Sequence, residues 1–178
     1  MKDVLSFESV TSTNDYLKEN YQKLNHLTIV AADFQTKGRG QFLRTWESNS
    51  KENLLFSILL KNVKSDDVSL VQSIIVEMII SFFKFRQIPV YFKEPNDFYV
   101  DQKKIGGILI ETKIKKSSCL YLVVGIGLNI NQEDFENKNA TSVYLLKKRK
   151  LSLILAKQHF FQKIRRTFNE IKQYLLET

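Results

Sequence analysis

The fold of this chain is decided by one apolar stretch, Leu54-Leu55-Phe56-Ser57-Ile58-Leu59-Leu60. A short and nearly continuous apolar run predicts a strand that is covered on both faces. Ser65-Asp66-Asp67 follows and predicts the start of a long helix, which Pro89 bounds. Apolar residues recur along that helix at steps of three and four, at Val71, Ile74, Ile75, Met78, Ile79 and Phe82. A covered strand followed by an amphipathic helix indicates a layered protein that contains both kinds of element.

The same periodicity predicts further elements on both sides of this pair. Shorter runs rich in β-forming residues predict strands near residues 4–7, 27–32, 90–92, 107–111 and 120–126, with a hairpin over 99–104. Ser12 and Thr13 are N-cap candidates for a helix that runs to about residue 24. From Leu151 onward, one helix face is marked by Phe160, Ile164, Phe168, Ile171 and Leu175. We therefore expect an α+β fold, a mixed β-sheet with helices packed on one face.

Composition narrows the classes of protein. The chain has 178 residues, 43% of them hydrophobic, with one cysteine (Cys119) and two histidines. These values fit one globular domain, and they exclude an internal disulfide and a zinc site. The sequence has no apolar run of the roughly 18 residues that a membrane span needs, and it shows no secretion signal at Met1. Collagen, coiled coil, membrane protein and disulfide scaffold are excluded, and a cytoplasmic location is expected.

The charge balance is basic. Lys and Arg number 27 against 19 Asp and Glu, which gives a formal net charge of +8. A basic protein suits an anionic partner such as a nucleotide, a nucleic acid or an acidic protein. A solvated lysine-rich surface explains the same charge, and the basic residues form no single tail, so both interpretations stay open.

The loop after the 27–32 strand carries the most informative motif, Gln35-Thr36-Lys37-Gly38-Arg39-Gly40, followed by Arg44 and Trp46. Two glycines around an arginine let backbone N–H groups approach an anion closely. Arg39 and Arg44 add charge-assisted hydrogen bonds of the kind that phosphate accepts, and Trp46 offers a flat face to a base. A flexible surface loop is the alternative, because Gly-x-Gly alone is a weak signal.

Three further motifs carry candidate polar groups. Lys93-Glu94-Pro95-Asn96-Asp97 is a good β-turn, and it would also hold a lysine and an aspartate near a phosphate–metal pair. Lys104-Ile105-Gly106-Gly107-Ile108-Leu109 would let a ligand lie against the backbone beside an ammonium, or is a β-bulge next to an exposed lysine. Gly125-Ile126-Gly127-Leu128-Asn129-Ile130-Asn131 ends a buried strand and would present an amide to a purine or ribose, or is an ordinary strand-to-loop transition.

In their order and separation, Ser12-Thr13-Asn14 and these four motifs resemble the biotin protein ligase family, over residues Phe7 to Asn131. The resemblance implies a catalytic domain of the biotin/lipoate ligase type. It implies that the protein joins biotin to ATP, giving biotinyl-5′-adenylate (biotinyl-5′-AMP) and pyrophosphate. The biotinyl group would then pass to a lysine of the biotin carboxyl carrier protein of acetyl-CoA carboxylase. Biotin and ATP would be substrates, with Mg²⁺ as the metal ion.

The resemblance also assigns roles to residues. The catalytic groups would be Lys104, Arg39 and Arg44, with Lys104 between the biotin carboxylate and the attacked α-phosphate. Biotin would be bound by Ser12, Thr13, Asn14, Gln35, Gly38, Arg39, Gly40, Gln41, Lys104 and Gly107. ATP would be bound by Arg39, Arg44, Trp46, Lys93 and Asn129, with Trp46 stacked on adenine and Asp97 near Mg²⁺. No nucleophilic Ser or Cys is required, because the substrate carboxylate attacks.

Three positions depart from the family's usual pattern. Gln41 replaces an arginine that helps to retain the adenylate, and a glycine of the same loop is replaced by Leu43. Glu94 stands where the family usually has tryptophan. Glu94 keeps open a lipoate-type ligase acting on another small carboxylic acid, and Gln41 and Glu94 keep open a homologue that binds without turnover. The net charge of +8 keeps open a non-catalytic basic nucleic-acid-binding protein.

The two ends also differ from longer relatives. We expect a catalytic core over residues 1–131 and a mainly helical C-terminal extension over 132–178, with no clear counterpart of the family's small C-terminal barrel. The helix-turn-helix domain of repressor relatives has no counterpart before the core, so no DNA partner and no membrane partner is expected. An edge strand of the sheet would allow a homodimer.

Overall fold

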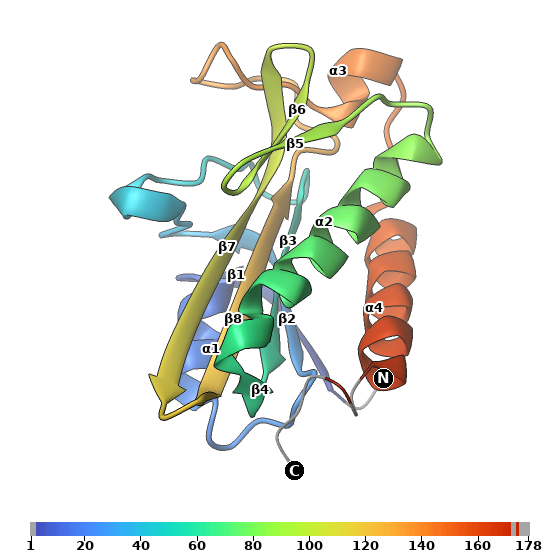
Figure 1. The fold of residues 1–178 in the computed structure, drawn as a ribbon. Helices are drawn as coiled ribbons and strands as arrows, with labels where there is room; N and C mark the ends of the chain where they lie inside the picture. The colour runs from blue at the N-terminus through green and yellow to red at the C-terminus, as the bar shows by residue number, and fades with distance from the viewer. Residues whose placement is uncertain (1–2, 172–173, 175–178) are drawn as a thin grey trace.

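A mixed β-sheet forms the centre of the computed structural model, which describes residues 3–171 and residue 174. The strands are β1 (Val4–Val10), β2 (Ile29–Gln35), β3 (Leu54–Leu60), β4 (Val63–Lys64), β5 (Tyr91–Lys93), β6 (Asp97–Val100), β7 (Lys103–Lys115) and β8 (Ser118–Leu128). Their order is β1-β2-β3-β8-β7-β6-β5, and β4 pairs with β8 (Figure 1). Only β1 and β2 run parallel among the described strand pairs, so the expected mixed sheet is confirmed.

The helices lie on both faces of this sheet. They are α1 (Thr13–Asn20), α2 (Val68–Lys84), α3 (Val143–Lys147) and α4 (Leu153–Glu170), with 3₁₀ turns at Gln41–Leu43 and Ser65–Asp67. The two long helices, α2 and α4, cover one face, while α1 lies behind the sheet (Figure 1). The expectation of helices on one face therefore holds for α2 and α4 and needs correction for α1. The reason is Leu17, which is buried against Val30 and Val123 on the opposite face.

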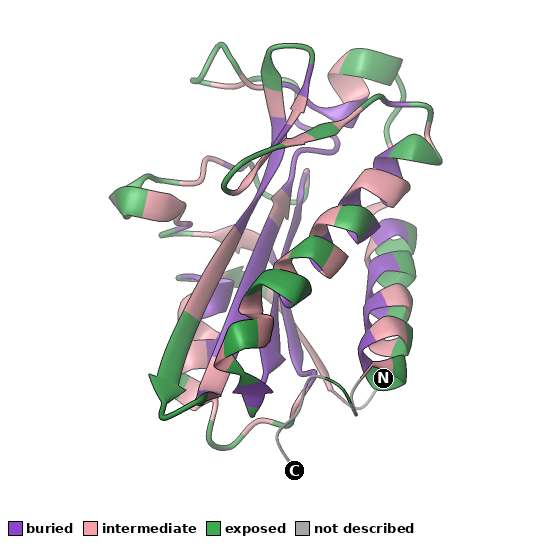
Figure 2. Ribbon diagram, in the orientation of Figure 1, coloured by how far each residue is buried: buried purple, intermediate pink, exposed green. Residues whose placement is uncertain are grey.

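The larger core fills the space between the sheet and the two long helices. Every residue of β3 is buried, as its apolar sequence predicted (Figure 2). Phe56 of β3 contacts Phe160 and Phe161 of α4. Phe160 also packs on Phe82 of α2, with ring centroids 4.5 Å apart. Helix α4 thus completes the core of the sheet.

The C-terminal part of the described chain is helical. Between residues 129 and 171 the structure contains α3 and α4 and no further strand. Leu175, which we expected on the apolar face of the last helix, lies outside the described residues. Over the same described ranges, no helix is both long and apolar enough to cross a membrane.

The sheet register brings the candidate motifs to one end of the sheet. Val10, just before α1, pairs with Gln35 at the end of β2. Leu54 at the start of β3 pairs with Leu128 at the end of β8, and Gly127 of β8 pairs with Gly107 of β7. Gly107 in turn pairs with Asp97 at the start of β6. Segments far apart in sequence therefore meet at the same end of the sheet, and that end carries the candidate site.

Candidate active site

A floor of glycines creates the site on the α1 face of the sheet. Side chains alternate between faces along a strand, and on this face β7 and β8 place Gly107, Gly125 and Gly127 at neighbouring positions. A Cβ atom at Gly125 would overlap the side-chain amide of Asn14, and one at Gly127 would lie 2.6 Å from the Trp46 ring. The glycines therefore let α1 and the 36–46 loop approach the sheet closely.

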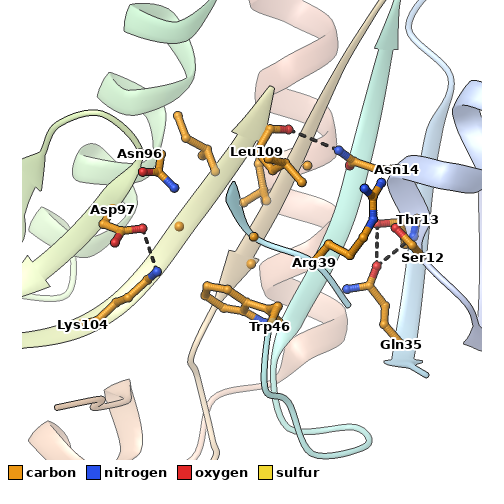
Figure 3. Close-up of a pocket in the computed structure, with 16 residues that line it drawn as sticks. Ser12, Thr13, Asn14, Gln35, Arg39, Trp46, Asn96, Asp97, Lys104 and Leu109 are labelled. Carbon is orange, nitrogen blue, oxygen red and sulfur yellow. Dashed lines mark hydrogen bonds and ion pairs between the residues drawn. The ribbon is translucent and has the colours of Figure 1, made fainter. Parts of the chain in front are cut away.

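The cavity above this floor has two chemically different ends (Figure 3). Ser12, Thr13, Asn14 and Gln35 line what we call the amide end. Asn96, Asp97 and Lys104 line the opposite side, which we call the lysine end. Arg39, Gly40, Trp46, Gly107 and Leu109 also line the cavity.

Trp46 covers the glycine floor. A Cβ atom at Gly107 would come within 3.2 Å of its ring, and Lys104 Nζ lies 5.3 Å from the ring centroid. The free volume of this cavity is about 40 Å³. Because the indole ring contacts the floor at Gly107 and Gly127, a ligand can lie on that part of the floor only when the ring moves.

The amide end is built around the start of α1. Ser12 caps this helix by accepting a hydrogen bond from the backbone N–H of Asp15. The backbone N–H of Thr13 donates to Gln35 Oε1 at 2.8 Å, which ties the helix start to the end of β2. Asn14 Nδ2 donates to Glu111 Oε2 at 2.7 Å and reaches Leu109 O at 3.3 Å. These bonds fix the positions of four of the expected binding residues.

Beside the amide end lies a cluster of two acids and two bases. Arg39 Nη2 lies 2.6 Å from Asp15 Oδ1 and 3.3 Å from Glu111 Oε1. Lys18 Nζ lies 2.7 Å from Glu111 Oε1 and 2.9 Å from Asp15 Oδ1. Burial alone would raise the pKa of Glu111, but the hydrogen bonds from Lys18 and Asn14 and the charges of Lys18 and Arg39 bring it below the ordinary value. The cluster therefore keeps Glu111 ionised and anchors the 36–46 loop through Arg39.

This cluster predicts an acid-dependent loss of stability. Because the pKa of Glu111 is depressed in the folded state, its contribution to stability is fully present above the unfolded-state pKa near 4.5. That contribution is lost as the pH falls from there through the folded-state pKa. We expect Glu111→Gln to unfold at a lower temperature than the wild type at pH 7, with a difference that shrinks below about pH 4.5. Thermal unfolding followed by circular dichroism across pH checks this, and a difference independent of pH would contradict it.

The lysine end combines a cation with an acid. Lys104 Nζ lies 2.7 Å from Asp97 Oδ1, and both side chains are partly buried.

A second cavity of about 460 Å³ adjoins this end and is lined by Gln41, Arg44 and Lys93 among others. A third, of about 120 Å³, is lined by Trp46, Lys104 and Asn129 among others. Asn129 Nδ2 donates to Thr141 O, while its buried Oδ1 has no hydrogen-bond partner among the described residues. A buried acceptor of this kind is suited to a ligand that donates.

The sequence pattern of the biotin/lipoate A/B protein ligase family matches residues 6–129. The chain belongs to this family. The matched range contains the first three motifs, the fourth as far as Asn129, and every residue that lines the first cavity.

Individual relatives of the ligase family agree with this. Biotin–protein ligase 1, chloroplastic, of Arabidopsis thaliana is 33% identical over 129 residues, which cover 68% of this chain and 35% of the relative. The bifunctional ligase/repressor BirA of Bacillus subtilis is 32% identical over 110 residues, which cover 60% of this chain and 33% of the relative. This chain thus spans about a third of the length of the curated relatives it matches.

A solved ligase structure matches nearly all of this chain. The biotin protein ligase from Aquifex aeolicus in complex with biotin and ATP superposes with a TM-score of 0.76 at 29% identity. The superposition covers 97% of this chain and 73% of that one. The expected fold of the biotin/lipoate ligase catalytic domain is confirmed.

The expected ligase residues gather around these three cavities, with one exception. Ser12, Thr13, Asn14, Gln35, Arg39, Gly40, Trp46, Asp97, Lys104 and Gly107 line the first cavity, and Gln41, Arg44, Lys93 and Asn129 line the adjoining two. Gly38 lines none of the three. It is buried, and its carbonyl accepts a hydrogen bond from the backbone N–H of Trp46, so it closes the loop.

The ligase motifs did not reveal every residue of the site. Asp15, Lys18 and Glu111 form the charged cluster together with Arg39, and no expectation from the sequence included these three. Ser57 was noticed only as part of an apolar strand, although it is the single polar residue of that strand. A polar side chain in an otherwise buried strand was the available signal.

Proposed function

We propose that this protein is a biotin protein ligase that forms biotinyl-5′-AMP and transfers the biotinyl group to a lysine of a biotin carboxyl carrier protein, that of acetyl-CoA carboxylase. One observation carries the proposal: fixed amide and hydroxyl groups and a lysine ammonium face the same glycine-floored cavity from opposite ends. Biotin has the matching shape, with a polar cyclic urea at one end and a carboxylate at the other.

The first half-reaction requires two anions to meet. A biotin carboxylate oxygen attacks the α-phosphorus of ATP, the bond from that phosphorus to the bridging oxygen breaks, and pyrophosphate leaves. Lys104 would donate hydrogen bonds to the carboxylate and to an α-phosphate oxygen, in place of its present partner Asp97. Arg44 lines the adjoining cavity, where it would face the outer phosphates. Arg39 is held by Asp15 and Glu111, so it would reach the substrates from the amide end.

The nucleotide would occupy the cavities next to the lysine end. The Trp46 ring, once moved off the glycine floor, would stack on adenine, and Asn129 Oδ1 would accept a hydrogen bond from the exocyclic amine of adenine.

The described residues hold no group of three His, Cys, Asp or Glu side chains that would bind a metal alone. Mg²⁺ commonly binds one or two carboxylates together with substrate phosphates, and Asp97 fits that mode. Asp97 and the phosphates would hold Mg²⁺, which neutralises charge on the departing pyrophosphate.

The second half-reaction needs no nucleophile from this chain. The neutral amine of the carrier lysine attacks the biotinyl carbonyl, AMP leaves, and the amine loses its proton as the amide forms. The enzyme's part is to orient the mixed anhydride and to keep water from it. The basic net charge of +8 suits an acidic carrier protein as well as ATP.

Biotin-dependent exchange of radioactive pyrophosphate into ATP tests the first half-reaction directly. We expect exchange with biotin and little with lipoate. Exchange with lipoate alone would support the lipoate-type alternative, which Glu94 beside the second cavity keeps under test. Absence of exchange with both acids, with intact folding, would contradict the proposed activity. Emission from Trp46, the single tryptophan, reports ligand binding independently.

Gln41→Arg is expected to slow release of the adenylate. Gln41 lines the cavity next to the lysine end, where an arginine would add a charge-assisted hydrogen bond to a phosphate oxygen. Such a bond is worth about 1.5–3 kcal/mol when buried, and partial exposure reduces this, so we expect about tenfold slower release. Single-turnover release of labelled adenylate measures it, with Gln162→Arg at an exposed position of α4 as the control. An unchanged rate would contradict a retaining role at position 41.

A further inference from the structure

The amide end contains a chain of four oxygen atoms in close contact. Ser57 of β3 is fully buried, and a buried hydroxyl is costly unless it is hydrogen-bonded. Its Oγ lies 2.6 Å from Thr13 Oγ1 and 2.5 Å from Asn14 Oδ1. Thr13 Oγ1 lies 3.0 Å from Gln35 Oε1. This row of hydrogen-bonded oxygen atoms therefore runs from Gln35 through the two hydroxyls to Asn14.

The oxygen atoms at the two ends of this row, Asn14 Oδ1 and Gln35 Oε1, can only be acceptors. The Asn14 amide nitrogen faces Leu109 O and Glu111 Oε2, which are acceptors, so the amide cannot be turned and Oδ1 must face Ser57. Gln35 Oε1 faces the backbone N–H of Thr13, which can only donate. Neither end supplies a hydrogen atom to the hydroxyls between them.

Three contacts are therefore served by two hydroxyl hydrogens. Each hydroxyl has one hydrogen to donate. The two shortest contacts must each contain a hydrogen atom, because oxygen atoms 2.5 or 2.6 Å apart without a hydrogen between them repel strongly. Ser57 then donates to Asn14, and Thr13 donates to Ser57. The longest of the three contacts is the one of 3.0 Å, in which only Thr13 Oγ1 can donate to Gln35 Oε1. When the Thr13 hydrogen points to Ser57 instead, this contact is left without one.

We propose that Ser57 sets the hydrogen-bond polarity of the amide end and thereby selects a carboxylic acid whose ring carries N–H donors. By drawing the Thr13 hydrogen inward, Ser57 leaves acceptors at the end of the cavity that Thr13 and Gln35 line. The N–H groups of a cyclic urea satisfy these acceptors, whereas the dithiolane ring of lipoate leaves them unpaired. The inference rests on the proposed ligase function and adds its substrate selectivity. Ser57 does not line the cavity, so it is a positioning residue.

The size of the effect follows from unpaired polar groups. A site that pairs a substrate N–H discriminates strongly against an analogue without it, because the buried acceptors lose their partner. In Ser57→Ala the Thr13 hydroxyl is free to donate to Gln35 or into the cavity. We expect the KM for biotin to rise about tenfold with kcat changed less than about twofold. The preference for biotin over lipoate in kcat/KM should fall by at least about tenfold.

The experiment compares three acids on the full chain. Pyrophosphate exchange is measured with biotin, with desthiobiotin, which keeps the cyclic urea, and with lipoate. The variants are Ser57→Ala, Ser57→Cys, which keeps the size with a weaker donor, and the control Ser73→Ala on the exposed face of α2. Desthiobiotin should follow biotin in every variant, the cysteine variant should lie between wild type and alanine, and the control should match wild type.

The outcomes separate this inference from the proposed function. A folded Ser57→Ala that keeps the wild-type preference for biotin overturns the inference and leaves the ligase function intact. If the alanine variant fails to fold, an unchanged preference in Ser57→Cys overturns it equally. If the wild type shows no exchange with any acid, the proposed function fails. Ligand-linked thermal shifts of the wild type and Ser57→Ala then decide the inference alone, since it requires biotin and desthiobiotin to stabilise the wild type more than lipoate does, and this difference to shrink in the variant.

Discussion

Lys104→Ala is expected to lower biotin-dependent pyrophosphate exchange by a factor of about 100 to 1000, because removal of one preorganised donor at developing charge typically has this effect. Lys104 is the cation at the end of the cavity opposite Thr13 and Gln35, and its Nζ lies within 2.7 Å of a carboxylate. Its loss removes positive charge at the point where two anions must meet. It also leaves Asp97 partly buried without a counter-ion near the phosphates, which adds repulsion.

The neighbouring lysine offers a matched control. Lys103 precedes Lys104 on β7, is exposed, and lines none of the three cavities. Lys103→Ala should therefore exchange at the wild-type rate. The loss in Lys104→Ala should fall mainly on kcat, since the interaction strengthens as charge develops. Equal exchange by wild type and Lys104→Ala, with equal thermal stability, would remove Lys104 from the chemistry.

The sequence identified the parts of the site that depend on local motifs. Gln35 and Lys104 could be chosen because glycines beside a polar or cationic residue have a direct structural meaning. Gln35 and Lys104 lie near the same end of the sheet because of the strand register, which in β7 and β8 places Gly107 opposite Gly127. That register arises from pairing across the whole sheet and is not encoded in either motif. The family resemblance assigned these residues to one site, and the structure shows the register that brings them together.

The contacts that hold Asn14 in place could not be predicted from the sequence. Asn14 contacts Glu111 across 97 positions of sequence and Ser57 across 43. Nothing local to Ser57 indicates that its hydroxyl meets α1, because the same serine in another register would face the α2 and α4 core. Such long-range polar contacts are specified by packing on both faces of a strand, which a single sequence does not display. The helix-face expectation needed correction for the same reason, since Leu17 alone gives no sign of which face it covers.

The second large effect is expected from Phe160→Ala, which we expect to lower the free energy of unfolding by about 3–5 kcal/mol. Phe160 is 1% exposed, and its ring contacts those of Phe56 and Phe82 from two other elements. Truncation removes this contact and leaves a cavity where β3, α2 and α4 meet. The effect would show that α4, beyond the expected core boundary at residue 131, is needed for stability.

Urea unfolding of the full chain measures this difference, and a matched variant isolates its cause. Ile154→Ala lies on the same helix at a side chain that is 71% exposed, so it should change stability by less than about 0.5 kcal/mol. For a chain of this length each kcal/mol shifts the unfolding temperature by roughly 2–4 °C, so Phe160→Ala should unfold about 6–20 °C lower. The two variants differ in burial and share their helix, so a large gap between them assigns the loss to the core. Equal stability of both would mean that α4 rests on the sheet without completing its core, and the C-terminal segment would then be an appendage.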